Sequence, residues 1–122
     1  MATINLTADT FQSTVKQDGV VLVDFWADWC RPCKAFAPIF EASSSTNTGV
    51  VHAKVDTESE QALGSAFAVT AIPTLMAFRD GVMVFRQAGA LPAPALQQVV
   101  DAIAALDMDE VRREIAEHNS GH

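Results

Sequence analysis

Apolar residues along the chain occur either in short continuous runs or at every third or fourth position, with polar turns between them. The continuous runs, bounded by Gly, Pro or Asp, predict four strands, at 20–26, 50–55, 71–78 and 82–85. The helically spaced segments predict helices at 7–18, 33–43, 58–66 and 92–106. Because strands that alternate with helices pair in parallel, we expect an α/β fold with helices on both faces of a mixed sheet. Asp80-Gly81 adds an antiparallel hairpin at its edge.

Residues 1–106 hold all of these elements and form one predicted domain. Residues 107–122 form a C-terminal extension. Its apolar residues share one helical face: Met108, Val111 and Ile115. The pattern predicts a short amphipathic helix with a frayed end from Asn119. The sequence leaves open whether this extension caps the sheet, contacts a partner or is disordered.

The charge of the chain limits the classes of molecule that it is expected to bind. The formal net charge is −7 and the eight basic residues are scattered, which argues against nucleic acid, since phosphate contacts need clustered Lys and Arg. The first six residues lack the features of a targeting signal, and no apolar run is long enough to cross a bilayer. We therefore expect a cytoplasmic monomer without membrane association.

The only two cysteines, Cys30 and Cys33, follow a buried strand and open a helix. Their spacing puts both sulfur atoms on one side of the first helical turn. A structural disulfide is one alternative, but it would close a very small loop and stabilise the fold weakly. A zinc site is another, but zinc needs about four ligands and the three histidines lack ligand spacing. Redox exchange is the interpretation we favour.

The order of attack follows from helix position. Cys30 at the helix N-terminus should have a lowered pKa and act as the nucleophile, with Arg31 and Lys34 adding positive charge. Cys33, inside the first turn, should be more buried and act as the resolving thiol. Cys30 would attack a substrate disulfide, and Cys33 would then release the reduced product.

Asp24 interrupts the apolar strand 20–26. Burial should raise the pKa of its carboxyl, so it is a candidate proton acceptor for Cys33. The alternative is a buried polar group whose hydrogen bonds are satisfied. Lys54 is a candidate partner if strand 50–55 lies beside strand 20–26. The alternative for Lys54 is a solvated strand end.

With the stretch Trp29-Cys30-Arg31-Pro32-Cys33 in place, the chain resembles thioredoxin of the cytoplasmic bacterial type over residues 3–106. The resemblance rests on matching segments in order: 23–27, 29–34, 37–38, 53–56, 72–74, Gly81 and Gly89. It implies the thioredoxin fold, a central mixed sheet flanked by four helices. It further implies a cis peptide bond before Pro73, opposite the disulfide, and Trp26 packed beneath the motif.

The resemblance also implies a substrate rim. Its residues would be Trp29, Ile72, Pro73, Gly89 and Ala90. The backbone at Ile72 would pair with an extended substrate segment. The alternative for Trp29 and Ile72 is packing in the core.

The function that the resemblance implies is protein disulfide reduction. A thioredoxin reductase, an NADPH-dependent flavoprotein, would recycle the disulfide, with no cofactor or metal bound to this chain. Arg31 replaces the usual glycine, and its charge should shift the redox potential toward a more oxidising value. Pro32 is the second residue expected to tune the potential. A disulfide oxidase or isomerase is therefore an alternative, and a non-catalytic holdase or interaction module is another.

Overall fold

The computed structural model describes residues 3–120. Ten elements follow one another along this part of the chain: β1 (Thr3–Asn5), α1 (Ala8–Val15), β2 (Val20–Trp26), α2 (Arg31–Thr46), β3 (Val51–Asp56), α3 (Gln61–Ala66), β4 (Thr74–Arg79), β5 (Val82–Ala88), α4 (Ala93–Ala104) and α5 (Met108–Ser120). The strands form one sheet in the order β1-β3-β2-β4-β5.

Strand β2 lies at the centre of this sheet. It pairs in parallel with β3 and antiparallel with β4, and β4 pairs antiparallel with β5. The six residues 20–25 are all buried, as the continuous apolar run predicts. At the β4–β5 hairpin both Asp80 and Gly81 have positive φ, the conformation for which an Asp-Gly pair is suited.

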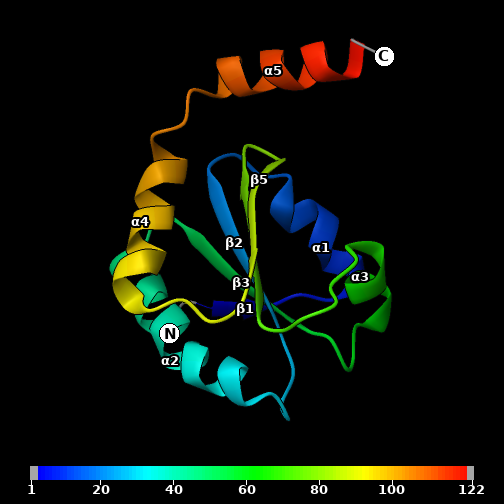
Figure 1. Ribbon diagram of the computed structural model, residues 1–122, viewed down its shortest axis with the longest axis vertical. Helices are drawn as coiled ribbons and strands as arrows, with labels where there is room; N and C mark the ends of the chain where they lie inside the picture. The colour runs from blue at the N-terminus through cyan, green and yellow to red at the C-terminus, as the bar shows by residue number, and fades with distance from the viewer. Residues whose placement is uncertain (1–2, 121–122) are drawn as a thin grey trace.

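Helices cover both faces of the sheet, with α1 and α3 on one side and α2 and α4 on the other (Figure 1). Alternate residues of β2 divide between the two cores. Val21, Val23 and Phe25 join the α1/α3 core, whereas Val20 and Leu22 join the α2/α4 core. By the same alternation Asp24 points to the α2/α4 side, the side of the helix that carries the cysteines.

Some predicted bounds need correction. The prediction missed β1, which pairs with β3 and contributes a three-residue edge strand. Helix α2 continues to Thr46, past the polar residues predicted to end it, and Ser44 is buried there with its hydroxyl donating to the Glu41 carbonyl oxygen at 2.6 Å. The strand predicted at 71–78 begins at Thr74, after the proline.

Beyond α4 the chain forms α5, which is helical through Ser120. The predicted fraying from Asn119 is not seen at Asn119 or Ser120, and the last two residues lie outside the described part of the chain. Asp107 Oδ1 accepts hydrogen bonds from the backbone N–H groups of Asp109 and Glu110, at 3.1 and 3.2 Å. This N-cap fixes where α5 starts.

Candidate functional site

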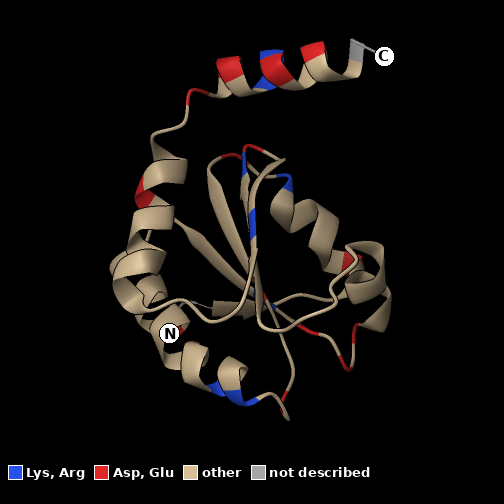
Figure 2. Cartoon of the chain, in the orientation of Figure 1, with Lys and Arg blue, Asp and Glu red and all other residues tan. Residues whose placement is uncertain are grey.

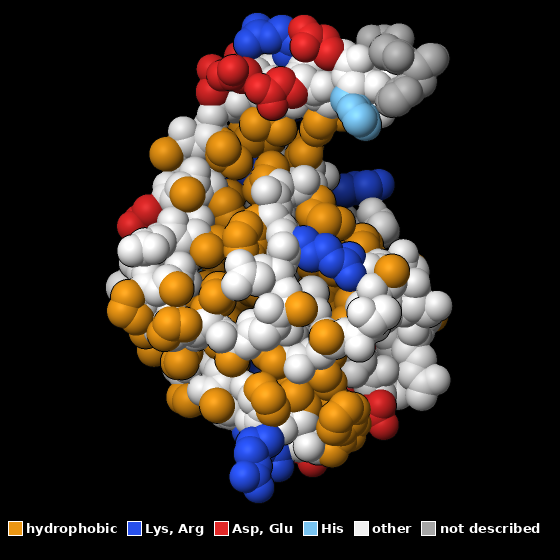
Figure 3. All heavy atoms as spheres, viewed as in Figure 1, with side chains coloured by type: hydrophobic (Ala, Val, Ile, Leu, Met, Phe, Trp, Pro, Cys, Tyr) orange, Lys and Arg blue, Asp and Glu red, His pale blue; other side chains and the backbone are white. Residues whose placement is uncertain are grey.

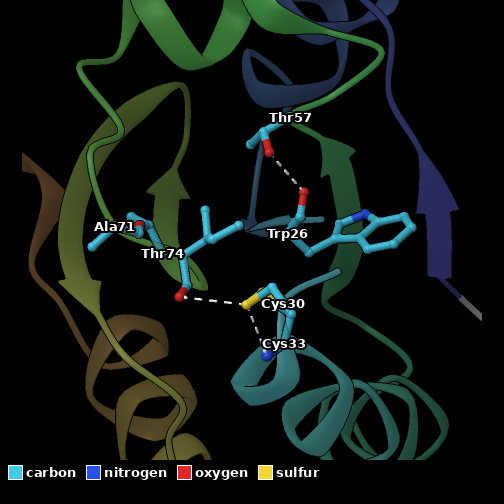
Figure 4. Close-up of a disulfide and its surroundings, with 7 residues drawn as sticks. Trp26, Cys30, Cys33, Thr57, Ala71 and Thr74 are labelled. Carbon is cyan, nitrogen blue, oxygen red and sulfur yellow. Dashed lines mark hydrogen bonds between the residues drawn. A yellow bond between two sulfur atoms is a disulfide. The ribbon is translucent and has the colours of Figure 1, made fainter. Parts of the chain in front are cut away.

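The two cysteines form a disulfide at the start of α2. Cys30 is the N-cap residue, and its Sγ accepts a hydrogen bond from the Cys33 N–H at 3.2 Å (Figure 4). Pro32 occupies the first turn, where a missing N–H removes no helical hydrogen bond. The Cys30 sulfur therefore lies at the positive end of a sixteen-residue helix, which favours a thiolate there once the disulfide is reduced.

The cysteines are equally buried, each 3% exposed. The prediction that Cys33 is more buried than Cys30 is therefore wrong. Ala27, Trp26 and Ile72 pack around the pair and cover both sulfur atoms. What distinguishes the two cysteines is the hydrogen bond from the Cys33 N–H to the Cys30 sulfur, because it stabilises negative charge on Cys30.

A loop from between α3 and β4 faces the disulfide. The Ile72–Pro73 peptide bond is cis, as the resemblance implies, and the Ile72 carbonyl oxygen lies 3.6 Å from the Cys30 sulfur. The Gly89 N–H donates to the Pro73 carbonyl oxygen at 2.8 Å, and the Thr74 hydroxyl donates to the Ala71 carbonyl oxygen at 2.5 Å. The loop residues Ala71 and Thr74 lie on one side of the disulfide (Figure 4), and the Gly89 contact joins the end of β5 to the same loop.

The predicted rim residues surround this loop with unequal exposure. Trp29 is 69% exposed, so the alternative of core packing fails for it. Ile72 is half-buried and Pro73 is buried, whereas Gly89 and Ala90 are exposed. Trp29 and Ile72 also line an open cavity of about 390 Å³ that extends toward α3. An apolar, accessible surface therefore adjoins the disulfide.

Asp24 is completely buried, and neither carboxylate oxygen has a hydrogen-bond partner. Desolvation raises the pKa of this carboxyl to about 7, against the lowering effect of the Lys54 charge. No protein group among the described residues satisfies the Asp24 carboxyl by a hydrogen bond. A carboxyl with this pKa exchanges its proton near neutral pH, which suits an acid–base role.

Lys54 is the residue of β3 directly beside Asp24 in the sheet. Its ammonium lies 4.9 Å from the centre of the Trp26 ring, close enough for a cation–π contact. Lys54 is half-buried, so it is not a fully solvated strand end. It acts on Asp24 through charge, without a direct hydrogen bond to it.

Sequence reasoning missed Thr57, which secures the end of β2. Its N–H and hydroxyl both donate to the Trp26 carbonyl oxygen, at 2.9 and 3.0 Å (Figure 4). A threonine directly after a buried strand was the available signal, but only the pairing of β3 with β2 brings it to Trp26. It thereby holds the segment that leads into the cysteines.

The basic residues of α2, Arg31 and Lys34, both lie in its first turn and are exposed (Figure 2). The acidic residues Asp28 and Glu58 are exposed elsewhere around the site. In the described part of the chain, no three His, Cys, Asp or Glu side chains come together as a metal site requires. Nor does residue range 3–120 contain a helix long and apolar enough to span a membrane.

Comparison with known proteins decides the family, since the thioredoxin family model matches residues 2–102. The chain belongs to the thioredoxin family. Among curated thioredoxins, the putative thioredoxin 2 of Streptomyces coelicolor is 47% identical over 119 residues, which cover 98% of this chain and 89% of the relative. Thioredoxin C-2 of Corynebacterium nephridii is 41% identical over 80% of this chain and 93% of its own length.

Solved thioredoxin structures match the fold. A mutant form of the Halobacterium salinarum thioredoxin gives a TM-score of 0.79 at 33% identity, over 86% of this chain and 93% of its own. The Malassezia sympodialis thioredoxin gives 0.77 at 30% identity, over 86% and 96%. The protein is a thiol–disulfide oxidoreductase with the thioredoxin fold and a disulfide formed by its CxxC pair.

Proposed function

We propose that this thioredoxin-family protein is a protein disulfide reductase that a thioredoxin reductase recycles with electrons from NADPH. The observation that carries the proposal is the Cys30–Cys33 disulfide at the start of α2, beside the accessible Trp29. Membership of the thioredoxin family supports the same activity. The working compartment that we propose is the cytoplasm, where the dithiol form would be maintained.

The first step is attack by the Cys30 thiolate on one sulfur of a substrate disulfide. A bond forms between the Cys30 sulfur and that atom, and the second substrate sulfur leaves as a thiolate that takes a proton from solvent. The helix N-terminus and the Cys33 N–H favour the attacking thiolate. The substrate chain would lie along Ile72, with Trp29, Pro73, Gly89 and Ala90 as its apolar surroundings.

In the second step Cys33 resolves the mixed disulfide. Its proton passes to the Asp24 carboxylate, directly or through a water molecule, and the Cys33 thiolate then attacks the Cys30 sulfur. The substrate sulfur bound to Cys30 leaves, so that two electrons have moved from the Cys30–Cys33 dithiol to the substrate. The Lys54 charge favours ionised Asp24 as the proton acceptor.

Trapping experiments on insulin test the order of attack, because burial does not separate the two cysteines. Cys33→Ser should accumulate a covalent adduct with insulin, since Cys30 attacks but nothing resolves the intermediate. Cys30→Ser should form no adduct and reduce no insulin. An adduct with Cys30→Ser and none with Cys33→Ser would reverse the assigned roles, and adducts with neither would refute the exchange mechanism.

Reduction of the Cys30–Cys33 disulfide by a thioredoxin reductase is tested in a coupled assay. Thioredoxin reductase with NADPH should support catalytic turnover of insulin by the wild type, and oxidation of NADPH should stop with Cys30→Ser. Turnover with dithiothreitol but not with the reductase would refute this choice of electron donor. If Cys30→Ser reduces no insulin itself but suppresses the aggregation of insulin that dithiothreitol has reduced, the holdase would be favoured instead.

Arg31 supports a second candidate function, a disulfide oxidase or isomerase. Its charge lies in the first turn of α2, directly after Cys30, where it favours the reduced thiolate form and so a more oxidising protein. Refolding of reduced ribonuclease tests the oxidase, and refolding of ribonuclease with scrambled disulfides tests the isomerase. A rate of refolding that exceeds the rate of insulin reduction would favour the oxidase or isomerase.

A further inference from the structure

Helix α5 is an addition to the part of the chain that matches the family. The thioredoxin match ends at residue 102, whereas α5 begins at Met108. The alignment with the Streptomyces coelicolor relative covers 98% of this chain and therefore includes most of α5. The role of α5 thus has to be inferred from its own contacts.

The first part of α5 packs against the rest of the domain. Met108 is 6% exposed and Val111 is half-buried, and an Arg112 nitrogen lies 3.7 Å from Asp80 Oδ2 in the β4–β5 hairpin. One turn later Ile115 is 42% exposed. Figure 1 shows α5 crossing above the end of the sheet. The apolar face of α5 is therefore only partly covered.

An apolar groove, which we call the α5 groove, lies between α5 and β5. A cavity of about 350 Å³ lies between α5 and β5, with apolar walls formed by Met83, Val84, Leu106, Val111 and Ile115. A second cavity of about 470 Å³ shares Val84 and Leu106 with the first and continues between β5 and α4 as far as Leu91. Figure 3 shows apolar side chains from the underside of α5 down this face. Contiguous exposed apolar surface of this kind marks interaction sites.

The walls of the α5 groove have the spacing of helix-packing surfaces. Ala95, Val99 and Ile103 of α4 follow one another at intervals of four residues, and so do Val111 and Ile115 of α5. Rows at this spacing form ridges, and the ridge of another helix packs into the groove beside them. The shape therefore fits an amphipathic helix better than an extended strand.

The charged residues around the α5 groove indicate which charge a bound partner should carry. Glu114 lines the groove and has no ion-pair partner among the described residues. Two nearby arginines are engaged: Arg112 with Asp80 and Asp109, and Arg79 with carbonyl oxygens at the end of α4. Acidic residues recur along α5 (Figure 2). A cationic side chain entering the groove would therefore meet the Glu114 carboxylate.

We propose that the α5 groove binds an amphipathic helix of a protein partner, with its apolar ridge against Val111 and Ile115 and a Lys or Arg against Glu114. A second copy of this chain fits less well, because the acidic α5 helices of two copies would repel each other. The proposal does not depend on disulfide exchange, since the contacts that it uses, at Val111, Glu114 and Ile115, lie on α5 and belong to neither the cysteines nor the rim.

A synthetic amphipathic helix of leucine and lysine serves as the probe, with its affinity measured by fluorescence anisotropy. The oxidised wild type should bind it, and Ile115→Ser should weaken binding about tenfold or more, because an apolar anchor is lost. Ile4→Ser is the matched control. Ile4 is 44% exposed but lies on β1, at the opposite edge of the sheet from β5. It should leave the affinity unchanged.

Glu114→Gln tests the charge. It should weaken binding about twofold to fivefold at ~0.15 M salt and have no effect at ~1 M salt. Insulin reduction by Ile115→Ser should equal that of the wild type, which separates this proposal from the redox function. The proposal is overturned if the wild type does not bind the probe, or if Ile115→Ser and Ile4→Ser bind it alike. Self-association that Ile115→Ser abolishes, seen by sedimentation velocity, would identify a second copy as the occupant instead.

Discussion

Replacing Asp24 by Asn should stabilise the oxidised protein above neutral pH and lose this effect in acid. Asp24 is fully buried without hydrogen-bond partners, and desolvation raises its pKa from 3.8 to about 7. The folded state therefore holds this proton more tightly than the unfolded state. Between these two pKa values the free energy of unfolding falls as pH rises, and above about pH 7 the penalty is complete.

The magnitude follows from the size of the shift. The difference between 3.8 and about 7 is roughly three pKa units, and each unit corresponds to ~1.4 kcal/mol. Ionised Asp24 should thus lower the free energy of unfolding by about 4 kcal/mol, a large share of a total on the order of 10 kcal/mol. Asparagine has nearly the same shape and no proton to lose, so it removes the pH-dependent part.

Urea denaturation of the oxidised wild type and Asp24→Asn, followed by circular dichroism from about pH 4 to about pH 9, measures this effect. The difference in unfolding free energy should grow across that range and level off near the top. Asp28→Asn is the matched control, because Asp28 is an exposed carboxylate four residues away. A difference for Asp24→Asn that stays constant with pH would refute the assigned cause, and an equal rise for Asp28→Asn would do so as well.

Three further predictions concern other parts of the molecule. Burial lowers the pKa of His52, against the effects of Val50 and Glu41, so stability should fall as pH drops below about 6.5, and His52→Gln should flatten this slope in denaturation curves. Arg31→Gly should lower the redox potential by about 5 to 20 mV in glutathione titrations, because an exposed cation stabilises the thiolate only modestly. Met108→Ala should cost about 2 kcal/mol of stability in guanidinium denaturation, since Met108 anchors the start of α5.

Each of these has a contrary outcome. An unchanged acid slope in His52→Gln would mean that another group titrates there. A potential that does not fall in Arg31→Gly would remove the support for a more oxidising protein. If Met108→Ala melts like the wild type, the contact of α5 with the body contributes nothing to stability.

The fold could be predicted where one pattern dominated locally. The apolar run of β2 and the Asp-Gly hairpin specify a buried strand and a turn by themselves. Strand β1 could not be predicted, because its three residues are half-exposed or exposed and are too few to show an alternation of apolar and polar positions. It exists only because β3 offers a free edge after the α2 crossover. Tertiary pairing decides such short elements.

In the candidate site, too, the sequence predicts some features and not others. Asp24 could be found from the sequence because a carboxylate inside an apolar run implies desolvation. The relative burial of the cysteines could not, since it depends on how Ala27, Trp26 and Ile72 close around both sulfur atoms. The position of a cysteine along a helix predicts its distance from the positive end of the helix dipole and its spacing from the second cysteine. It does not predict which residues pack over the helix end. The same limit applies to the α5 groove, whose walls come from three separate elements.

The pairing of β2 with β4 also sets when the site can mature during synthesis. Asp24 lies between Lys54 of β3 and Leu75 of β4 in the sheet. A nascent chain that has emerged only through β3 lacks β4, so we expect its Asp24 to be hydrated and to ionise like an ordinary aspartate. Both cysteines emerge from the ribosome some forty residues before Leu75. The thiols are therefore made and exposed well before the buried acid acquires its unusual affinity for a proton.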